Sequence, residues 1–504
     1  MKLIFKITAF CLFIFFVSNF SSCKKDKLLK DASAKLEFSQ DSVLFDTVFT
    51  GIGSATRNVR IRNTYNQKLK ISSIQLLGGS ASPFIINVDG AKGTNFTDLE
   101  IAAHDSMYIF VQVNVNPTNV NSPLIISDAI KFVVNGNEQT MILEAWGQDA
   151  YYHRPDSVIK FQDGSQFPYS VATAVPNSYN KVGDEIVWKN DKPHVIYGYL
   201  VVDEYQKLKI LENTKVYLNY KAGIWVYAGG QIQVLGKKDK EVVFQGARRE
   251  KDYADEAGQW DRIWINEGKA NNIIDYAIIK NGYIGLQCEF LGDDVKYKDT
   301  AQLVLTNTKI QNMSYWGLYC KYFTVYANNT VISNCQEHSV NISLGGGYRF
   351  AHCTFANYWS KDKVREKATL SINNYNDVQT LPLNLVIANC IVDGKLENEV
   401  NLDIKTAVNT QVTYTFANCW LKTNINTTDP LNFINVRKGA KADVLEYKDI
   451  AVYNFEPLAK ENRITNFTGP LAEQYAKYFG MPYVDINAKL RNTTSVTAGA
   501  YETQ

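Results

Sequence analysis

The stretch Asn389-Cys-Ile-Val-Asp-Gly394 is one of six related copies, and their recurrence decides the fold. Position two of each copy is Ala, Thr or Cys, and position four is always a larger apolar residue. Because alternate residues of a strand face the same side, both positions are predicted to be buried. Asn or Gly often closes a copy, which suits a turn with positive φ. The other copies are Tyr276–Asn281, Asn307–Asn312, Asn329–Asn334, His352–Asn357 and Asn418–Thr423.

The fourth positions of successive copies are 31, 22, 23, 37 and 29 residues apart. Such spacing is typical of coils that bury their apolar faces only by stacking on one another. We therefore predict an all-β chain with a right-handed parallel β-helix over residues 196–450, and we expect function in the loops that lengthen some coils. An antiparallel sandwich is the alternative, but hairpin signals of the Asn-Gly or Asp-Gly type are scarce in this region.

Two columns of identical residues follow from aligning the copies. Stacked coils lie about 4.8 Å apart, so aligned amides can form hydrogen-bonded ladders and aligned thiols can pack together. The wide spacing of the cysteines contains no CxxC pair, so we expect no metal cluster, and buried reduced thiols are favoured over disulfides. The columns are Asn307, Asn329, Asn389 and Asn418, and Cys353, Cys390 and Cys419.

Residues 1–22 have the pattern of an export signal, with Lys2 and Lys6 before an apolar run that is short for a membrane span. The run ends in Phe20-Ser-Ser-Cys23, which resembles a bacterial lipobox, so Cys23 is the predicted lipid anchor. Residues 23–34 would then be a tether. This predicts a lipid-anchored outer-membrane protein facing the cell surface or the periplasm; an ordinary secretory signal is the alternative.

The remaining chain falls into three further segments. About eight short alternating strands over residues 35–150 predict an immunoglobulin-like β-sandwich. Residues 151–195 lack a sustained period and are predicted to be a connector and N-terminal cap of the solenoid. Residues 451–504 are predicted to be a C-terminal cap that contains a short helix over Leu471–Gly480.

Three further stretches resemble a Bacteroidetes family of right-handed parallel β-helix repeat lipoproteins with an N-terminal immunoglobulin-like spacer domain. The resemblance covers nearly the whole exported chain and implies fold and location. It adds little chemistry, because the molecular activity of that family is generally unassigned. The stretches are Gly258–Ile263, Gly345–Trp359 and Gly499–Glu502.

Catalytic signals are sparse. Lys plus Arg (53) nearly balance Asp plus Glu (51), and without a basic stripe nucleic acid is not an expected partner. The adjacent pair Asp293 and Asp294, with Arg349, are the weak candidates for a polysaccharide hydrolase or a calcium-assisted lyase, although a solvated loop explains the two aspartates more simply.

His352 occupies an outward first position, which favours a surface hydrogen-bonding role over catalysis. We expect no cofactor and no metal site.

Aromatic residues are dense in and around the loops between coils, and aromatic faces can stack against sugar rings. A wall-covering role is the simpler interpretation of them. We favour a non-enzymatic envelope protein whose β-helix binds or displays toward an extracellular partner, a glycan or a surface protein. A lyase or hydrolase and a purely structural protein are the alternatives, and the charged excursion Arg248–Glu256 is a further contact-loop candidate. The predicted ligand-binding residues are Tyr315, Trp316, Tyr319, Tyr322, Tyr358 and Trp359.

Overall fold

The computed structural model describes residues 27–51, 53–116, 124–174, 185–266, 272–289, 300–361, 363–467, 483–492 and 494–503. The chain divides between Asp149 and Ala150 into two compact units. Both consist of strands joined by turns, with four short 3-10 helices, η1 (Gly79–Ala81), η2 (Lys251–Tyr253), η3 (Ile450–Val452) and η4 (Asn462–Ile464). The predicted signal segment 1–22, the anchor Cys23 and the helix Leu471–Gly480 lie outside the described residues.

The first unit contains two five-stranded sheets, with orders β1-β3-β8-β5-β6 and β2-β10-β9-β4-β7. Both contribute to one buried cluster, to which Val43, Ile71, Ile109 and Phe132 belong. All eight predicted strands are present, and β6 and β7 are additional. The strands are β1 (Glu37–Phe38), β2 (Ser42–Phe49), β3 (Arg57–Arg62), β4 (Leu69–Leu76), β5 (Phe84–Val88), β6 (Ala91–Gly93), β7 (Asn95–Ile101), β8 (Ser106–Val113), β9 (Leu124–Val134) and β10 (Asn137–Gln148).

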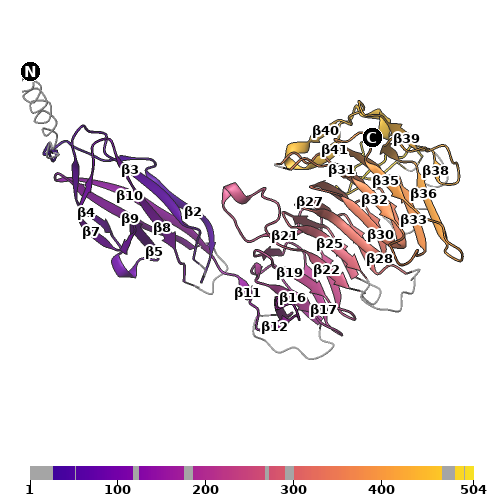
Figure 1. Ribbon diagram of the computed structural model, residues 1–504, viewed down its shortest axis with the longest axis horizontal. Coiled ribbons are helices and arrows are strands. Elements are labelled where there is room, and N and C mark those ends of the chain that lie inside the picture. The colour runs from indigo at the N-terminus through magenta and orange to yellow at the C-terminus, as the bar shows by residue number, and fades with distance from the viewer. Residues whose placement is uncertain are drawn as a thin grey trace, which may run out of the picture. The chain divides into compact units, whose positions relative to one another are not determined.

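Most described strands of the second unit are parallel and are hydrogen-bonded to the corresponding strand of the next coil (Figure 1). Two pairs are antiparallel, β12 (Ser157–Lys160) with β13 (Gln166–Val171) and β40 (Tyr447–Asp449) with β41 (Asn454–Pro457). One stack of parallel strands forms an eleven-stranded sheet, in which every neighbouring pair is parallel. Its strands are β11 (Tyr151–His153), β15 (His194–Ile196), β18 (Lys215–Leu218), β21 (Val242–Gly246), β24 (Ala277–Lys280), β27 (Lys309–Met313), β29 (Val331–Cys335), β31 (Thr354–Asn357), β34 (Ile391–Gly394), β37 (Trp420–Lys422) and β39 (Arg437–Gly439).

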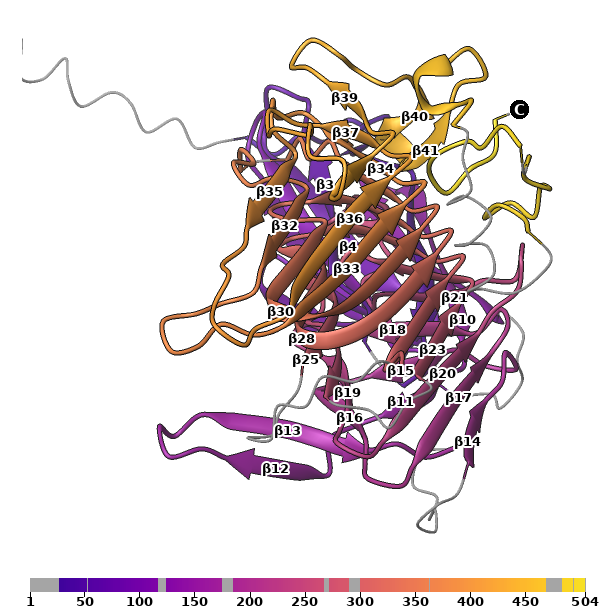
Figure 2. The ribbon, with the colours of Figure 1, turned by 90° about the vertical axis from the view of Figure 1, so that its right-hand side faces the viewer.

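An eighteen-stranded sheet contains two further stacks of parallel strands, which we call strand series. The two series join at the long strands β28 and β30, because each of these strands belongs to both (Figure 2). This is the strand arrangement that a parallel β-helix has. The strands are β12 (Ser157–Lys160), β13 (Gln166–Val171), β14 (Glu185–Trp188), β16 (Tyr199–Val202), β17 (Lys207–Leu211), β19 (Gly223–Val226), β20 (Gln231–Leu235), β22 (Ile263–Asn266), β23 (Asn272–Asp275), β25 (Ile284–Glu289), β26 (Leu303–Thr306), β28 (Trp316–Asn328), β30 (Val340–Ala351), β32 (Leu370–Asn373), β33 (Leu383–Ala388), β35 (Val400–Asp403), β36 (Val412–Ala417) and β38 (Phe433–Ile434).

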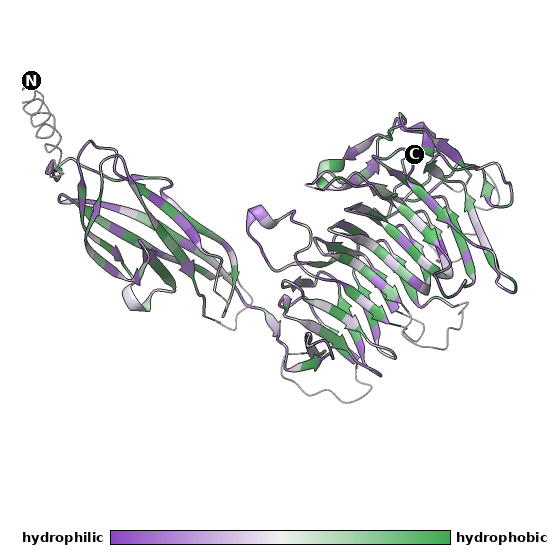
Figure 3. Cartoon of the chain, viewed as in Figure 1, coloured by the Kyte–Doolittle hydropathy of each residue, from purple (hydrophilic) through white to green (hydrophobic). Residues whose placement is uncertain are grey.

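The six copies are buried as predicted, and hydrophobic and hydrophilic residues alternate along the strands (Figure 3). Positions two and four of every copy have no exposed surface, because they point into one continuous core. The backbone explains the Asn column as well. The first residue of each copy, from Tyr276 to Asn418, has φ between 46° and 53°, a region that Asn adopts more readily than most residues. The sequence predicted positive φ at the closing residue and missed it at the first.

The predicted Asn ladder is present in part, since Asn389 bonds to His352 and no hydrogen bond joins its side chain to that of Asn418. The Asn329 side chain donates to Asn307 Oδ1 (3.0 Å), and Asn307 in turn donates to Asp275 Oδ1 (2.9 Å). Asn435 is not part of the predicted column. It begins one more coil and donates to Asn418 Oδ1 (2.8 Å). The six cysteines among the described residues are buried and free of disulfides, as favoured. These columns therefore stabilise the wall of the solenoid.

The C-terminal segment, by which we mean residues 440–467, 483–492 and 494–503, lies along the outer face of the eleven-stranded sheet. Val331, Ile391 and Trp420, which are outward third positions of their copies, form a buried cluster with apolar residues of this segment. The Gly499 amide donates to Asn389 O (2.8 Å) and the Ala500 amide donates to Thr354 Oγ1 (3.0 Å). The segment thus covers the side of several coils. The antiparallel pair β40 (Tyr447–Asp449) and β41 (Asn454–Pro457) belongs to it.

The predicted surface position of His352 is wrong. The side chain is 1% exposed, because the C-terminal segment covers it. Its Nε2 lies 2.6 Å from the Tyr483 hydroxyl and 3.1 Å from Asn389 Nδ2. Burial, and then the charge of Arg491, hold the pKa of His352 well below its usual range, so the ring is neutral.

Candidate functional site

The weak catalytic candidates are not assembled into a site by the described residues. Asp293 and Asp294, like the anchor Cys23, lie outside those residues. Arg349 lies on β30, in register with Tyr326 of the preceding coil, and its guanidinium carbon is 5.6 Å from the centroid of the Tyr326 ring. This is a cation–π contact along the wall.

The six predicted aromatic residues separate into two groups. Tyr322, Tyr358 and Trp359 are buried. Tyr358 donates from its hydroxyl to Asp393 Oδ2 (2.7 Å), and the Trp359 indole donates to Lys363 O (3.0 Å), so both are part of the interior. The other three, Tyr315, Trp316 and Tyr319, remain partly exposed and lie together.

These three rings continue a row that begins at Tyr283. The Tyr283 and Tyr315 rings are parallel within 1° at a centroid distance of 5.0 Å, and Tyr315 stacks on Trp316 at 4.1 Å. Trp316 then packs on Tyr319 at 4.5 Å. A ring stacked between two others has both faces occupied, so Tyr315 supports its neighbours. Tyr283 stands at the end of the row and is 39% exposed.

Tyr283 also borders a groove of about 710 Å³ at the N-terminal coils. Phe167 and Pro168 of the β12–β13 hairpin, which projects from these coils in Figure 2, contribute one wall. Tyr220, which is 75% exposed, lies on the rim. We call this site the aromatic groove, and the residues used below to describe it are Phe167, Tyr199, Tyr220, Asp261, Arg262 and Tyr283.

A second hollow of about 680 Å³ adjoins the aromatic groove and shares Tyr220 and Gly258 with it. The charged excursion Arg248–Glu256 lines it through Arg248, Asp252, Tyr253 and Glu256. The excursion contains η2, and Arg248 lies over the Tyr253 ring at 3.8 Å. The predicted contact loop therefore lines the hollow that adjoins the aromatic groove.

A chain of polar contacts fixes the floor of the aromatic groove. The Tyr199 hydroxyl donates to Asp261, and Asp261 pairs with Arg262 at 2.9 Å. Arg262 donates to the side-chain oxygen of Gln287, Oε1, and Gln287 Nε2 donates to Glu289 Oε1 (2.9 Å). The Trp264 indole also donates to Glu289 Oε1, at 2.7 Å. The network thus joins residues from the coil of β16 to residues at β22 and β25, across the coil of β19.

The charges of this network follow from its contacts. Burial raises the pKa of the Tyr199 phenol far above its usual range, and the adjacent Asp261 carboxylate adds to that effect, so the hydroxyl is a permanent donor. Burial works to lower the pKa of Arg262, but Asp261 and nearby tyrosines more than offset it, and the net shift is upward. The groove thus presents the Arg262 guanidinium beside aromatic surface, while the Tyr199 hydroxyl holds Asp261 in place.

The carboxylates of the groove argue against glycosidase chemistry there. Hydrolysis of a glycosidic bond uses two carboxyl groups on opposite sides of that bond. Asp261 is the carboxylate that lines the groove, and Glu289 connects to it only through Arg262 and Gln287. Asp252 and Glu256 line the adjoining hollow on an exposed loop. Among the described residues, the lining of the groove thus supplies the one carboxylate of Asp261.

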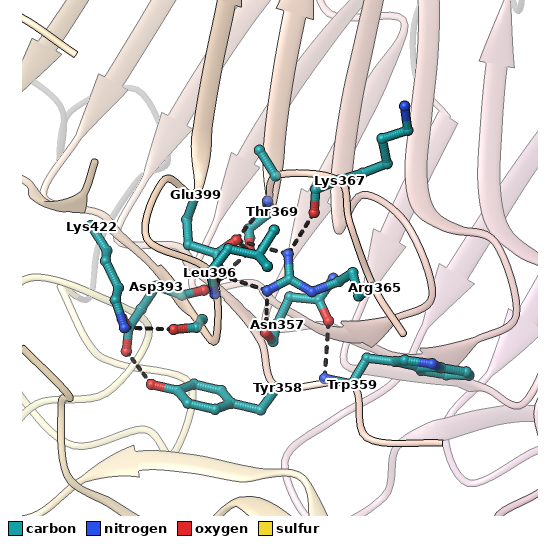
Figure 4. Close-up of polar contacts among 12 residues, drawn as sticks. Asn357, Tyr358, Trp359, Arg365, Lys367, Thr369, Asp393, Leu396, Glu399 and Lys422 are labelled. Atoms are coloured by element: carbon teal, nitrogen blue, oxygen red, sulfur yellow. Dashed lines mark hydrogen bonds and ion pairs between the residues drawn. The ribbon is translucent and has the colours of Figure 1, made fainter. Parts of the chain in front are cut away.

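A second polar cluster is entirely internal (Figure 4). Arg365 and Glu399 pair at 2.5 Å with side-chain exposures of 2% and 0%. Thr369 donates from its hydroxyl to Glu399 Oε2 (2.7 Å), and Leu396 N donates to Glu399 Oε1 (2.6 Å). The carboxylate is therefore satisfied on both oxygens, as buried charges require.

Asp393 lies beside this pair and accepts a hydrogen bond from the Tyr358 hydroxyl (2.7 Å) (Figure 4). It accepts a second from the Tyr447 hydroxyl (2.9 Å). Burial raises the pKa of Asp393 to about 6, although the two hydroxyls oppose the shift. A perturbed carboxylate is often a sign of a functional site. Asp393 has no exposed surface, however, and Tyr447 belongs to the C-terminal segment. We assign this cluster to docking of that segment.

The groove residues Tyr199, Tyr220, Arg262 and Tyr283 were not predicted from the sequence. A signal did exist: the outward positions of the first coils carry large aromatic residues, and the stretch Gly258–Ile263 contains Asp261 and Arg262. Within the described ranges, no group of His, Cys, Asp and Glu residues is arranged to hold a metal ion. The same ranges contain no helix that is both long and apolar enough to cross a membrane.

Comparisons with known proteins add little. No protein-family model matches the chain, and no curated protein matches it. Among solved structures, the catalytic domain of a family 87 α-1,3-glucanase is 10% identical over 77% of this chain and 87% of its own, with a TM-score of 0.20. A human CEP192 PapD-like domain is 14% identical over 26% and 94%, with a TM-score of 0.17.

A family 123 glycoside hydrolase from Clostridium perfringens is 9% identical over 22% of this chain, with a TM-score of 0.16. The match spans 23% of that enzyme, less than a quarter of its length. At these scores, none of the three likenesses carries an argument about function.

Proposed function

We propose that this chain is a cell-envelope lipoprotein whose solenoid binds an extracellular glycan in the aromatic groove without cleaving it. The groove is the observation that carries the proposal: exposed Tyr220 and Tyr283 stand beside the Arg262 guanidinium, which Asp261 holds in place. Aromatic surface suits the apolar faces of sugar rings, and fixed polar groups suit their hydroxyls. The proposal includes an immunoglobulin-like first unit as a spacer.

The proposal also assigns a right-handed coil to the second unit. Parallel strands joined by crossovers within one sheet are right-handed in nearly all known cases. Membrane attachment through acylated Cys23 is supported by the sequence pattern of residues 1–23. Replacing Cys23 with Ala is expected to release the exported protein from the membrane fraction; membrane association and normal processing of Cys23→Ala would contradict the anchor.

The test of binding uses the exported chain and a panel of neutral and acidic polysaccharides, scored for retention and for new reducing ends or unsaturated products. Retention without products is expected. Tyr283→Ala, which removes a ring at the end of the stacked row, is expected to weaken retention by roughly tenfold, the size of one lost stacking contact. The matched control is Tyr205→Ala, because Tyr205 is exposed but does not line the groove.

The alternative function is a polysaccharide lyase or hydrolase. Asp252 and Glu256 favour it, since they place two further carboxylates in the adjoining hollow. Products that disappear in Asp252→Asn, Glu256→Gln or Asp261→Asn, or in Asp293→Ala and Asp294→Ala, would establish the enzyme. Absence of retention and of products across the panel would leave a structural or protein-binding role.

A further inference from the structure

The aromatic groove continues into a line of outward side chains along the coil axis. We infer that the ligand is a neutral, extended, linear polysaccharide that lies along this line with about one sugar per coil. The inference rests on the proposed function and deepens it by naming the class of glycan. Its support is the register of the parallel strands, which is independent of the groove itself.

The register aligns one outward residue from each of seven successive coils, from β19 to β35. Neighbouring coils lie about 4.8 Å apart, so six steps span roughly 29 Å. The residue repeat of extended β-1,4-linked glycans is close to this coil spacing. We call this set the outer column, and its members are Trp225, Trp264, Gln287, Tyr319, Asn341, Ser371 and Asn401.

The outer column and the aromatic groove are joined by direct contacts. The Phe167 ring of the groove wall meets the edge of Trp225 at 5.4 Å. Arg262 of the groove donates to Gln287 of the column. Trp225 and Trp264 stack at 5.1 Å, and their indole nitrogens donate to Asn266 and Glu289 respectively, so the first two positions form a rigid apolar floor. A chain leaving the groove would meet this floor next.

The chemistry of the outer column identifies the ligand class. None of its seven residues is charged. Gln287 is buried and bonded to Arg262 and Glu289, so it continues the floor. Tyr319, Asn341, Ser371 and Asn401 carry hydroxyls and amides, which both donate and accept hydrogen bonds, as sugar hydroxyls do. Asn401 donates to Ser371 Oγ (3.2 Å), so polar side chains of neighbouring coils also bond to one another at the β35 end of the outer column. A uronic acid or sulfated chain would require cations in the column.

The experiment measures the binding of cello-oligosaccharides of two to eight sugars to the exported chain by calorimetry. Affinity is expected to rise at least tenfold between the dimer and the hexamer and to level off beyond about seven sugars. Malto-oligosaccharides, which coil and leave the register, are expected to gain little from added length. Oligogalacturonates test the charge of the ligand and are expected to bind more weakly than neutral chains of equal length.

Variants separate the column from the groove. The double variant Asn341→Leu with Ser371→Ala removes polar groups at the far part of the column, and is expected to weaken hexamer binding about tenfold while leaving the trimer unchanged. Asn384→Leu, a similar substitution on β33, serves as control because β33 belongs to the other strand series. Tyr283→Ala is expected to weaken all lengths.

The outcomes distinguish the two proposals. Binding of a glycan with no dependence on chain length, equal gains for malto-oligosaccharides, or tighter binding of oligogalacturonates would overturn the extended neutral chain and leave the groove as a binding site. Failure of every polysaccharide to bind would overturn the proposed function together with this inference.

Discussion

Two outer faces of the same solenoid differ in what they do with their outward residues. On the eleven-stranded sheet, Val331, Ile391 and Trp420 point outward and are buried by the C-terminal segment. On the strand series from β19 to β35, the outer column remains partly exposed for most of its length. One face therefore stabilises the fold through the chain's own residues, and the other is available to a partner.

The largest expected effect comes from the buried ion pair near the covered face. Arg365→Met leaves the Glu399 carboxylate buried without its partner, which costs about 3–5 kcal/mol of the free energy of unfolding. Urea unfolding followed by circular dichroism measures the loss. The double variant Arg365→Met with Glu399→Leu is expected to regain much of the stability, because no charge is left unpaired. A single variant as stable as the wild type would show that the pair is dispensable.

The difference between the covered face of the eleven-stranded sheet and the outer column is tested most directly by truncating one outward residue on each. Ile391→Ala is expected to cost about 3 kcal/mol, because the side chain is fully buried beneath the C-terminal segment. Asn341→Ala in the outer column is expected to change stability by less than about 0.5 kcal/mol. Denaturant midpoints of the two variants and the wild type measure both values. Equal losses would mean that the outer column is also structural.

Asp393 gives the covered face a pH dependence of a definite sign. Its pKa is about 6 in the folded chain, because burial disfavours the charge, against a usual value of 3.8. The folded state therefore holds the proton more tightly, and the contribution of Asp393 to stability falls as pH rises from about 4 to 6. The total change is about 3 kcal/mol for a shift of two units. Asp393→Asn is expected to lose this dependence.

The control for Asp393→Asn is Asp403→Asn, since Asp403 is exposed and accepts from Tyr375 (2.7 Å) on the strand series of the outer column. Unfolding free energies are compared at pH 4 and pH 6.5 for the three proteins. An unchanged pH dependence in Asp393→Asn would place the titrating group elsewhere.

The sequence predicts the repeating wall well because the rule behind it is local. Position two and position four recur within six residues, so the burial of Thr330 and Ile332 follows from alternation alone. The groove depends on residues that are distant in the chain: Phe167, Tyr220 and Tyr283 meet only after the coils from β13 to β25 have stacked. His352 shows the same limit, because its burial depends on Tyr483, 131 residues away.

The last prediction uses His352 to test how firmly the covered face is closed. The pKa of this ring is held well below 6.5 by burial and by Arg491, so the folded state excludes a proton that the unfolded chain accepts. Stability is therefore fully present above about pH 6.5 and is lost as pH falls, by up to about 1.4 kcal/mol per pH unit for one such group. Buried His153 and His194 act in the same direction at the other end of the solenoid.

Replacing His352 with Gln is expected to reduce the loss of stability of the C-terminal segment at low pH. His104→Gln in the first unit serves as control, because His104 is exposed. Hydrogen exchange at pH 5 provides the local readout. The Gly499 and Ala500 amides, which donate to the coils at 2.8 and 3.0 Å, are expected to exchange faster as His352 gains its proton. If these amides stay protected while the whole unit unfolds at once, the C-terminal segment is an inseparable part of the solenoid. Early exchange there, with the outer column unaffected, would show that the two faces are independently stable.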